Sequence, residues 1–216
     1  MGQYTKNGLY NGYKKNNKER EELDYYSTPS CEVENILNAL QIDLNNKLIL
    51  EPCIGGGHML EGILNYCNAK EMTPSIIGTE FKDRGYTSSL ENVSLKYDLD
   101  FLTDDYPVDT ADIIIMNPPY ATLEPFLIRA LEIAQEQLIV LCRMQVLEGA
   151  SRYKNIFKDN PPTYIYQYIE RIQCWKNGIK PEGSSAQGYC WLVFDKNKKE
   201  QEPILRWIGR SQNYGK

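Results

Sequence analysis

The sequence predicts an α/β protein with a mostly parallel central sheet, helices on both faces of that sheet, and an antiparallel edge pair of strands near the C-terminus. Three observations lead to this prediction. Short apolar runs such as Ile113–Ile115 lack polar alternation, which indicates strands buried on both faces. These runs alternate with segments whose apolar residues recur at helical spacing. A glycine cluster, Gly55–Gly57, follows the first run, at the place where open α/β sheets bind ligands.

The chain has 216 residues, of which 42% are hydrophobic and 25% are charged, as in an ordinary globular protein. We expect a polar, flexible N-terminal arm over residues 1–24 and a single domain over residues 25–216. No apolar stretch approaches membrane-spanning length, and the N-terminus is not a secretion signal. The protein is therefore expected to be cytoplasmic, without a membrane partner, and either a monomer or a dimer.

Six cysteines without CxxC spacing favour reduced thiols and argue against a zinc site, so no bound metal is expected. His58 is the only histidine, which argues against catalytic triads that use histidine. The net charge of −5 argues against a protein that coats nucleic acid through bulk electrostatics. Residues 143–187 nevertheless carry seven basic and four acidic side chains. This local excess of positive charge makes residues 143–187 candidate substrate-contacting connections.

The first part of the domain predicts a helix, then a strand, a glycine turn and a second helix. Ser30 is placed as the N-cap of the first helix, directly after the polar and aromatic segment Tyr25–Pro29. Leu48–Leu50 is the predicted strand, and Glu51 stands at its end, aimed into the expected crevice. Gly55–Gly57 then allows a ligand to approach the backbone closely.

Ser75–Glu80 is the second predicted strand, and it ends in an acid. A carboxylate at the end of the strand after a glycine turn can accept hydrogen bonds from two ribose hydroxyls. The simpler alternative for Glu80 is a solvated charge at a strand end. Phe81–Leu99 is predicted to be a mostly polar connection.

Asp112–Met116 is an apolar, β-branched run that stops at Asn117-Pro118-Pro119-Tyr120. Proline has no N–H and fixes φ at about −65°, so a central strand cannot continue through this turn. The turn offers a planar NH2 group two acceptors, Asn117 Oδ1 and the Pro118 carbonyl, while the Tyr120 ring can stack on its face. The simpler alternative is a strand that ends in a proline-rich loop.

The C-terminal half predicts a core helix over Glu124–Gln137 and a buried strand over Gln137–Cys142. Two further strands, Tyr164–Trp175 and Gly188–Asp195, are expected to form the antiparallel pair at the sheet edge. The remaining residues read as a charged tail with one apolar patch, Ile204–Ile208.

Taken together, these segments resemble the class I S-adenosylmethionine-dependent methyltransferases, specifically the group that methylates adenine in DNA. The resemblance covers roughly Tyr25–Asp195 and rests on five pieces in the family's order. These are Tyr26-Ser27-Thr28-Pro29, Glu51-Pro52 with Gly55 and Gly57, Glu80, Asp100-Phe101-Leu102, and Asn117-Pro118-Pro119-Tyr120. The resemblance implies a Rossmann-like class I methyltransferase fold, with S-adenosyl-L-methionine as the cofactor and S-adenosyl-L-homocysteine as the product.

The resemblance also implies direct methyl transfer to the N6 amine of an adenine that is flipped out of DNA. The residues that carry catalysis by this resemblance are Asn117, Pro118, Pro119 and Tyr120. The implied cofactor-binding residues are Tyr26, Thr28, Pro29, Glu51, Pro52, Gly55, Gly57, Glu80, Asp100, Phe101 and Phe126.

Within the cofactor set, the resemblance gives Glu51 the methionyl ammonium group and Glu80 the ribose hydroxyls. Asp100 is expected to meet the adenine amino group of the cofactor. The aromatic face of Phe101 or Phe126 is expected to lie against the cofactor's adenine ring.

The chain departs from larger family members, because only a short tail follows its last strand, where they carry a target-recognition domain. In this respect it resembles small phage-encoded adenine methyltransferases. Trp175, as a second aromatic side chain against the extruded base, and Lys180 are the candidate substrate contacts. The choice of DNA sequence would then rest on the N-terminal arm, the Arg143–Asn160 connection and the Lys176–Gln187 loop.

Other functions stay open at this point. The same catalytic turn suits methylation of RNA, or of a glutamine side chain in a translation factor. Glutamine methyltransferases usually carry a helical domain before the cofactor motifs, which residues 1–24 are too few to supply. The non-enzymatic alternative is a protein that keeps the methyltransferase fold and acts as a binding partner.

Overall fold

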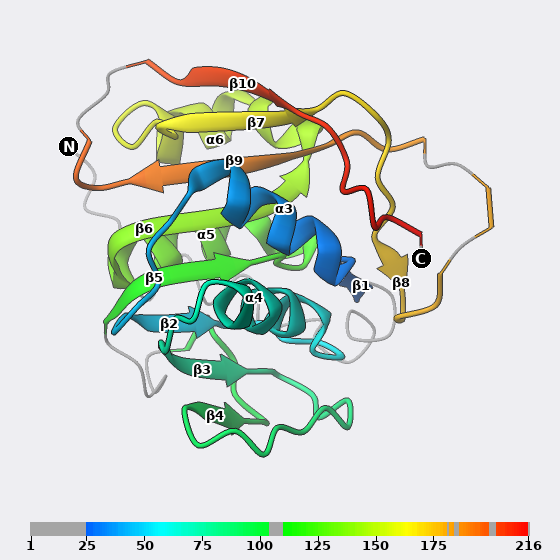
Figure 1. Ribbon diagram of the computed structural model, residues 1–216. Coiled ribbons are helices and arrows are strands. Elements are labelled where there is room, and N and C mark those ends of the chain that lie inside the picture. Colours follow the sequence, from blue (N-terminus) through cyan, green and yellow to red (C-terminus); the bar gives the residue numbers. More distant parts are fainter. Residues whose placement is uncertain (1–24, 104–109, 181, 184–185, 199–201, 216) are drawn as a thin grey trace.

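An eight-stranded sheet organises the protein. From one edge to the other its strands are β10 (Ile204–Ile208), β7 (Tyr164–Tyr168), β9 (Tyr189–Asp195), β6 (Ala134–Arg143), β5 (Ala111–Met116), β2 (Leu48–Glu51), β3 (Ser75–Thr79) and β4 (Val93–Lys96) (Figure 1). Neighbouring strands are parallel except for β9, which runs antiparallel to both β6 and β7. This is a Rossmann-like α/β fold, as the sequence predicts.

The computed structural model describes residues 25–103, 110–180, 182–183, 186–198 and 202–215. The N-terminal arm expected over residues 1–24 lies outside this part of the chain. No helix among the described residues is both long enough and apolar enough to cross a membrane.

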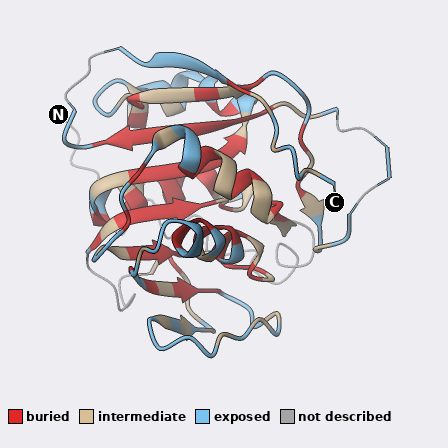
Figure 2. Ribbon diagram, viewed as in Figure 1, coloured by how far each residue is buried: buried red, intermediate tan, exposed pale blue. Residues whose placement is uncertain are grey.

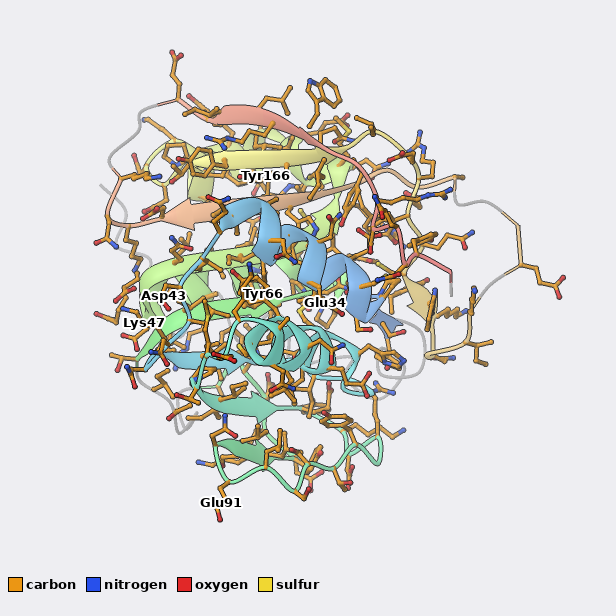
Figure 3. All side chains as sticks on the ribbon, viewed as in Figure 1. Glu34, Asp43, Lys47, Tyr66, Glu91 and Tyr166 are labelled. Atoms are coloured by element: carbon orange, nitrogen blue, oxygen red, sulfur yellow. The ribbon has the colours of Figure 1, made fainter. Side chains whose placement is uncertain are left out.

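Helices cover the two faces of the sheet. On one face lie α3 (Ser30–Leu40) and α4 (His58–Ala69), which stand in front of the strands in Figure 1. Behind the strands lies α5 (Leu123–Ile133), followed after β6 by the short turns α6 (Ala150–Arg152) and η4 (Tyr153–Phe157). Figure 2 shows the central strands buried between these layers, while charged side chains such as Glu91 point outward (Figure 3).

Strand β5 shows why the central strands are apolar throughout. Ile113 and Ile115 belong to the core beneath α3 and α4, whereas Ile114 and Met116 belong to the core beneath α5. Side chains alternate between the two faces of a strand, so a strand covered on both sides needs an apolar residue at every position. The burial of this strand on both faces is confirmed.

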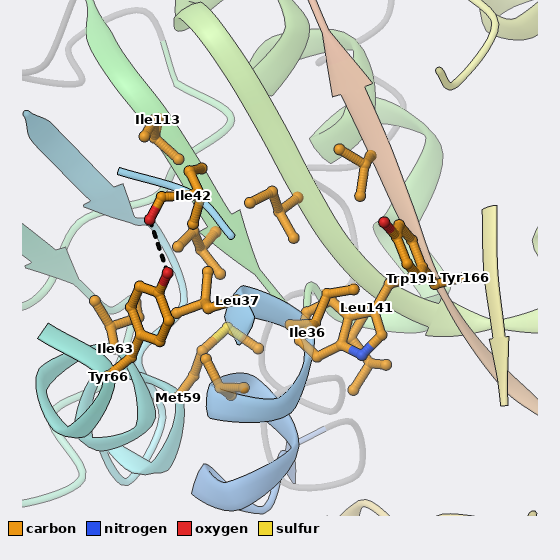
Figure 4. Packing of buried hydrophobic residues seen from close by; sticks show 14 of the residues in the cluster. Ile36, Leu37, Ile42, Met59, Ile63, Tyr66, Ile113, Leu141, Tyr166 and Trp191 are labelled. Atoms are coloured by element: carbon orange, nitrogen blue, oxygen red, sulfur yellow. Dashed lines mark hydrogen bonds between the residues drawn. The ribbon is translucent and has the colours of Figure 1, made fainter. Parts of the chain in front are cut away.

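The core beneath α3 and α4 is packed from both helices onto the sheet (Figure 4). Ile36 and Leu37 of α3 are fully buried, and each such side chain contributes about 1.5–3 kcal/mol. Tyr66 of α4 keeps its hydroxyl satisfied in this core by donating to the Ile42 carbonyl at 2.8 Å. The second core joins Leu127 of α5 to Leu50 and other strand residues.

The structure corrects several predicted helices, strands and connections. Ser30 is the first residue of α3, and Pro29 takes the N-cap position without a side-chain hydrogen bond. The helix predicted over Glu124–Gln137 ends at Ile133, because Ala134 turns to an extended conformation and joins β6. The strand predicted over Tyr164–Trp175 ends at Tyr168. The polar connection Phe81–Leu99 contains the edge strand β4.

The C-terminal tail also corrects the prediction. Its apolar patch, Ile204–Ile208, forms β10 and pairs in parallel with β7. The antiparallel pair of β7 and β9 exists as predicted, but β9 lies inside the sheet and β10 takes the edge. Four of the five residues of β10 are exposed, so its apolar residues do not mark a buried face, and pairing with β7 decides its conformation.

Candidate active site

The candidate site lies where the strand order of the sheet changes direction. After β2 the sheet grows through β3 and β4 on one side, whereas β5 pairs with β2 on the other side. Connections leave the carboxyl ends of β2 and β5 in opposite directions, which opens a crevice between them. Glu51 ends β2, and Asn117 follows β5 directly. The thiol of Cys53 donates to the Asn117 carbonyl at 3.5 Å, so the two turns are in contact.

The side chain of Asn117 is held in one orientation. Its Nδ2 group donates to the Tyr26 carbonyl at 2.9 Å and to Thr28 Oγ1 at 3.0 Å. A backbone carbonyl can only accept, so the nitrogen of the amide must face Tyr26. The other end of the amide, Oδ1, is buried and has no hydrogen-bond partner among the described residues. Buried acceptors in folded proteins are nearly always paired, so this oxygen is available to a ligand that donates.

A small second sheet fixes the partners of Asn117. Strand β1 (Tyr26–Ser27) pairs antiparallel with β8 (Trp175–Lys176), with Ser27 opposite Trp175. Figure 1 shows both strands beside the carboxyl ends of the parallel strands of the main sheet. Thr28 is only 2% exposed, and Pro29 begins the turn into α3. The segment that the sequence places at the cofactor is thus also in direct contact with the Asn117 turn.

Tyr120 lies in a group of aromatic rings. Its ring centroid is 5.4 Å from that of Tyr26 and 6.3 Å from that of Tyr189, and its hydroxyl donates to the Tyr189 hydroxyl at 3.2 Å. Burial raises the pKa of Tyr120 far above its ordinary value, so the hydroxyl stays neutral. The guanidinium of Arg143 lies over the Tyr120 ring. The Tyr120 ring, which is predicted to stack on the substrate, is therefore already in contact with the planar guanidinium of Arg143.

The two prolines shape this turn. Pro118 is buried, and Pro119 precedes the short helix η2 (Tyr120–Thr122). The Pro119 carbonyl accepts a hydrogen bond from the Thr122 N–H at 3.1 Å. The chain therefore passes from β5 into η2 within a few residues, and the φ angles of two of them, Pro118 and Pro119, are fixed by the proline rings.

The glycine turn has the conformation that glycine permits. Gly55 has φ +54° and Gly57 has φ +84°, both in the left-handed region. A Cβ atom at Gly55 would overlap the Tyr25 ring, and one at Gly57 would overlap the Tyr86 ring. Gly56 N–H donates to the Tyr25 hydroxyl at 2.6 Å. The space left by the absent side chains is therefore filled by two tyrosines of the chain itself.

Glu51 and Glu80 are both buried beside this turn. Burial, with the charge of Glu80 as a smaller cause, raises the pKa of Glu51 well above its usual range. Glu51 Oε2 has no hydrogen-bond partner in the described part of the chain. Glu80 instead accepts the Gly55 N–H at 2.7 Å and the Phe81 N–H at 3.0 Å, so this carboxylate braces the glycine turn.

The remaining predicted cofactor residues lie nearby or in the core. The Asp100 carboxylate accepts the Leu102 N–H at 2.9 Å within its own loop. Phe101 is 2% exposed and Phe126 is 8% exposed, and their ring centroids are 5.1 Å apart. The structure therefore places these two largely buried rings against each other in the core. Pro52 is buried between Glu51 and the glycine turn.

The two predicted substrate contacts, Trp175 and Lys180, have partners within the chain itself. The Trp175 ring meets the His58 ring edge-on at 5.7 Å between centroids, at the start of α4. The Lys180 ammonium donates to the Gly215 carbonyl at 2.7 Å. The structure thus places Trp175 beside the glycine turn and Lys180 beside the C-terminal residues.

An open cavity of about 720 Å³ adjoins the glycine turn. It is lined by Tyr25, Gly56 and His58, by the segment 82–84, and by the segment 176–178. Lys82, Arg84 and Lys176 bring positive charge to its wall, against the single acid Asp83. This balance favours a ligand that carries a negative group.

Three residues at the site were given no individual role from the sequence, although Tyr25 and Arg143 fall in segments that it singled out. Tyr25 stands directly before the recognised Tyr26, and a doubled tyrosine is a signal that could have been used. Arg143 ends the buried strand β6, where polar side chains of α/β proteins meet ligands. Tyr86 lies in an irregular segment and carries no sequence signal that we can name.

Comparison with known proteins identifies the fold. No protein-family model and no curated protein sequence matches the chain. The methyltransferase subunit of a type I restriction-modification system from Streptococcus thermophilus matches with a TM-score of 0.63 at 14% identity, over 87% of this chain and 48% of that one. A putative class I S-adenosylmethionine-dependent methyltransferase from Listeria monocytogenes matches with a TM-score of 0.60 at 15% identity, over 93% of this chain and 70% of that one.

A putative RNA methyltransferase from Pyrococcus horikoshii matches with a TM-score of 0.57 at 18% identity, over 88% of this chain and 97% of that one. The match to the type I restriction-modification subunit covers 48% of that subunit, so this chain spans about half of its length. At these identities the comparisons show a shared fold, which is that of structures described as methyltransferases.

Proposed function

We propose that the protein transfers a methyl group from S-adenosyl-L-methionine to the exocyclic N6 amine of adenine in DNA. The observation that carries the proposal is the Asn117 amide, whose oxygen is buried, unpaired among the described residues and fixed in direction. Because buried acceptors are nearly always hydrogen-bonded, such an oxygen is available to accept a hydrogen bond from an N–H group of a ligand. Its place after β5, across the crevice from the glycine turn, is where this fold binds ligands.

The chemistry needs acceptors at this point. The lone pair of the adenine amine is delocalised into the ring, so the amine is a weak nucleophile. Asn117 Oδ1 and the Pro118 carbonyl accept its two hydrogens in this proposal, which draws the nitrogen toward a tetrahedral shape and frees the lone pair. The acceptors are fixed before the reaction and act by position and electrostatics. When bound, the cofactor supplies an electrophilic methyl group and leaves as S-adenosyl-L-homocysteine.

The residues beside the glycine turn fit such a cofactor. Glu51 presents a buried carboxylate oxygen without a partner in the described residues, which suits the cofactor's ammonium group. The basic wall of the cavity suits its carboxylate. Tyr25 and Tyr86 lie over the glycine turn, so a ligand that takes this place must move both rings. Glu80, to which the resemblance gives the ribose hydroxyls, also fixes the conformation of the turn by accepting the Gly55 N–H.

DNA is the proposed substrate for two reasons. One similar fold is described as the methyltransferase subunit of a type I restriction-modification system, and another as a modification subunit of a putative type I restriction enzyme. A base of duplex DNA must also leave the stack before it can reach the Asn117 turn, where Tyr120 offers it a ring. The same turn could accept an RNA base, and one similar fold is described as a putative RNA methyltransferase. A glutamine side chain carries a comparable planar NH2 group.

The test follows the methyl label. The protein is incubated with labelled S-adenosylmethionine and, in separate reactions, duplex DNA, transfer and ribosomal RNA, and a translation factor. Label recovered as N6-methyladenine in DNA is the expected result. Label found only in RNA or protein overturns the choice of substrate, and no transfer to any of them favours the non-catalytic alternative. The variants Asn117→Ala and Tyr120→Ala should bind the cofactor with near-normal calorimetric affinity but lose transfer.

A further inference from the structure

We propose that Thr28 is a positioning residue for Asn117 rather than a contact of the cofactor. Its hydroxyl and the Tyr26 carbonyl engage both hydrogens of the Asn117 amide and so keep Oδ1 directed at the reacting amine. The effect on turnover rests on the proposed function, whereas the effect on the amide itself does not. The sequence resemblance had given Thr28 a role in cofactor binding.

The asparagine side chain is nearly symmetric at its amide end. A primary amide has nearly the same shape in two orientations related by a half turn, and only its hydrogen bonds distinguish them. In the reversed orientation Oδ1 would face the Tyr26 carbonyl, acceptor against acceptor. The NH2 group would then point at the amine of the substrate, donor against donor. A single partner leaves one amide hydrogen unpaired in a buried place, and Thr28 supplies the second partner.

Thr28 is itself fixed from both sides along the chain. Ser27 before it is paired with Trp175 in the small sheet, and Pro29 after it is the N-cap of α3. With 2% of its surface exposed, Thr28 has no room to exchange partners with water. The position of Oγ1 is therefore set by the backbone of two elements.

A further neighbour of the Thr28 hydroxyl is Cys174. The two side chains interact, and burial raises the pKa of the Cys174 thiol to about 12, so the sulfur stays neutral. The hydroxyl hydrogen can point toward this sulfur, which leaves an oxygen lone pair for the Asn117 amide. The Cys174 sulfur is also 3.9 Å from Asn117 Nδ2, too weak a partner to replace the hydroxyl.

The test replaces the hydroxyl without changing the shape of the side chain. Thr28→Val removes Oγ1, and Thr28→Ser restores it. Thr163→Val is the matched control, because Thr163 is also buried and its hydroxyl accepts the Asp195 N–H at 3.0 Å, away from the crevice. Three quantities are measured: kcat and KM for DNA, the calorimetric affinity for S-adenosylmethionine, and the hydrogen exchange of the Asn117 side-chain amide by NMR. The signals of that amide are identified by their loss in Asn117→Asp.

In Thr28→Val we expect kcat to fall roughly 10- to 100-fold, the usual effect of removing a partner that orients a primary ligand. Cofactor affinity should change less than about 2-fold, and the amide hydrogens should exchange faster with solvent. Thr28→Ser should recover both kcat and slow exchange, and Thr163→Val should change neither. A Thr28→Val variant with normal kcat, or one whose only defect is weaker cofactor binding, overturns the proposal. If the wild-type protein transfers no methyl group, the amide exchange still decides the role of Thr28.

Discussion

The guanidinium carbon of Arg143 lies 4.1 Å from the centroid of the Tyr120 ring and 5.6 Å from that of Tyr26. Arg143 ends β6 and Tyr120 follows β5, so the pairing of these two strands brings the residues together. A cation on a tyrosine ring is held by about 0.5–1 kcal/mol at an exposed site and about 2 kcal/mol when desolvated. A base that stacks on the same ring surface must displace the guanidinium.

Replacement of Arg143 should therefore strengthen the binding of a free nucleoside. In Arg143→Leu the affinity for adenosine, which carries no phosphate, should rise about 2- to 5-fold, the equivalent of about 0.5–1 kcal/mol. The measurement is an NMR titration with adenosine. Arg206→Leu is the matched control, because Arg206 lies 4.5 Å over the Tyr164 ring at the far edge of the sheet. An unchanged or lower affinity in Arg143→Leu would mean that arginine and base do not compete.

Glu51→Gln should make the protein more stable at neutral pH and bind the cofactor less tightly. Burial raises the pKa of Glu51 in the folded protein above the value of about 4.3 in an unfolded chain. The folded state therefore favours the protonated carboxyl, and stability is lost as the pH rises from about 4 through the folded pKa. Glutamine has no charge to bury, so the variant avoids that loss.

Thermal unfolding at pH 4 and pH 8 checks this prediction. The melting temperature of Glu51→Gln should match the wild type at pH 4 and exceed it at pH 8, by about 2–4 °C for each kcal/mol of penalty removed. The exposed Glu91 provides the control variant Glu91→Gln, which should show no such difference. A Glu51→Gln variant that is less stable at pH 8 would show that the ionised carboxylate has a stabilising partner.

Tyr25→Phe should bind S-adenosylmethionine more tightly. The Tyr25 hydroxyl accepts the Gly56 N–H, and a ligand on the glycine turn must compete for that donor. The net value of such a hydrogen bond is about 0.5–1.5 kcal/mol, so its loss should raise calorimetric affinity about 2- to 10-fold. Tyr66→Phe is the control, since Tyr66 donates to Ile42 in the core. Weaker binding in Tyr25→Phe would instead make the hydroxyl part of the ligand site.

Gly57→Ala should be more destabilising than Gly85→Ala. Both glycines have positive φ, +84° and +81°, so alanine costs about 1–2 kcal/mol of strain at either place. Only at Gly57 does the new Cβ overlap a ring, that of Tyr86, whereas nothing lies within 4 Å at Gly85. Urea unfolding should therefore show about 1–3 kcal/mol of additional loss at Gly57.

A double-mutant cycle assigns that additional loss. In the Tyr86→Ala background, Gly57→Ala should cost no more than Gly85→Ala does in the wild type, because the overlap is gone. Equal losses at Gly57 and Gly85 in the wild-type background would show that Tyr86 moves freely away from the turn.

The buried strands and the two turns could be predicted because their signals are local. Leu48–Leu50, Ser75–Glu80 and Asp112–Met116 each contain consecutive apolar residues, and each prediction corresponds to a strand, although β3 ends one residue earlier, at Thr79. Strand β10 could not be predicted, because its residues are largely exposed and its conformation comes from pairing with β7. The end of α5 at Ile133 is likewise decided by Ala134 joining the sheet.

The sequence by itself determined that glycines follow β2 and prolines follow β5. Glycine widens the range of backbone dihedral angles and proline narrows it, wherever either residue occurs in a chain. Only the tertiary structure decided their partners. Thr28 reaches Asn117 across 89 positions, and Arg143 reaches Tyr120 only because β5 and β6 pair. Such contacts depend on how distant segments pack, and local preferences for dihedral angle and periodicity carry no information about packing.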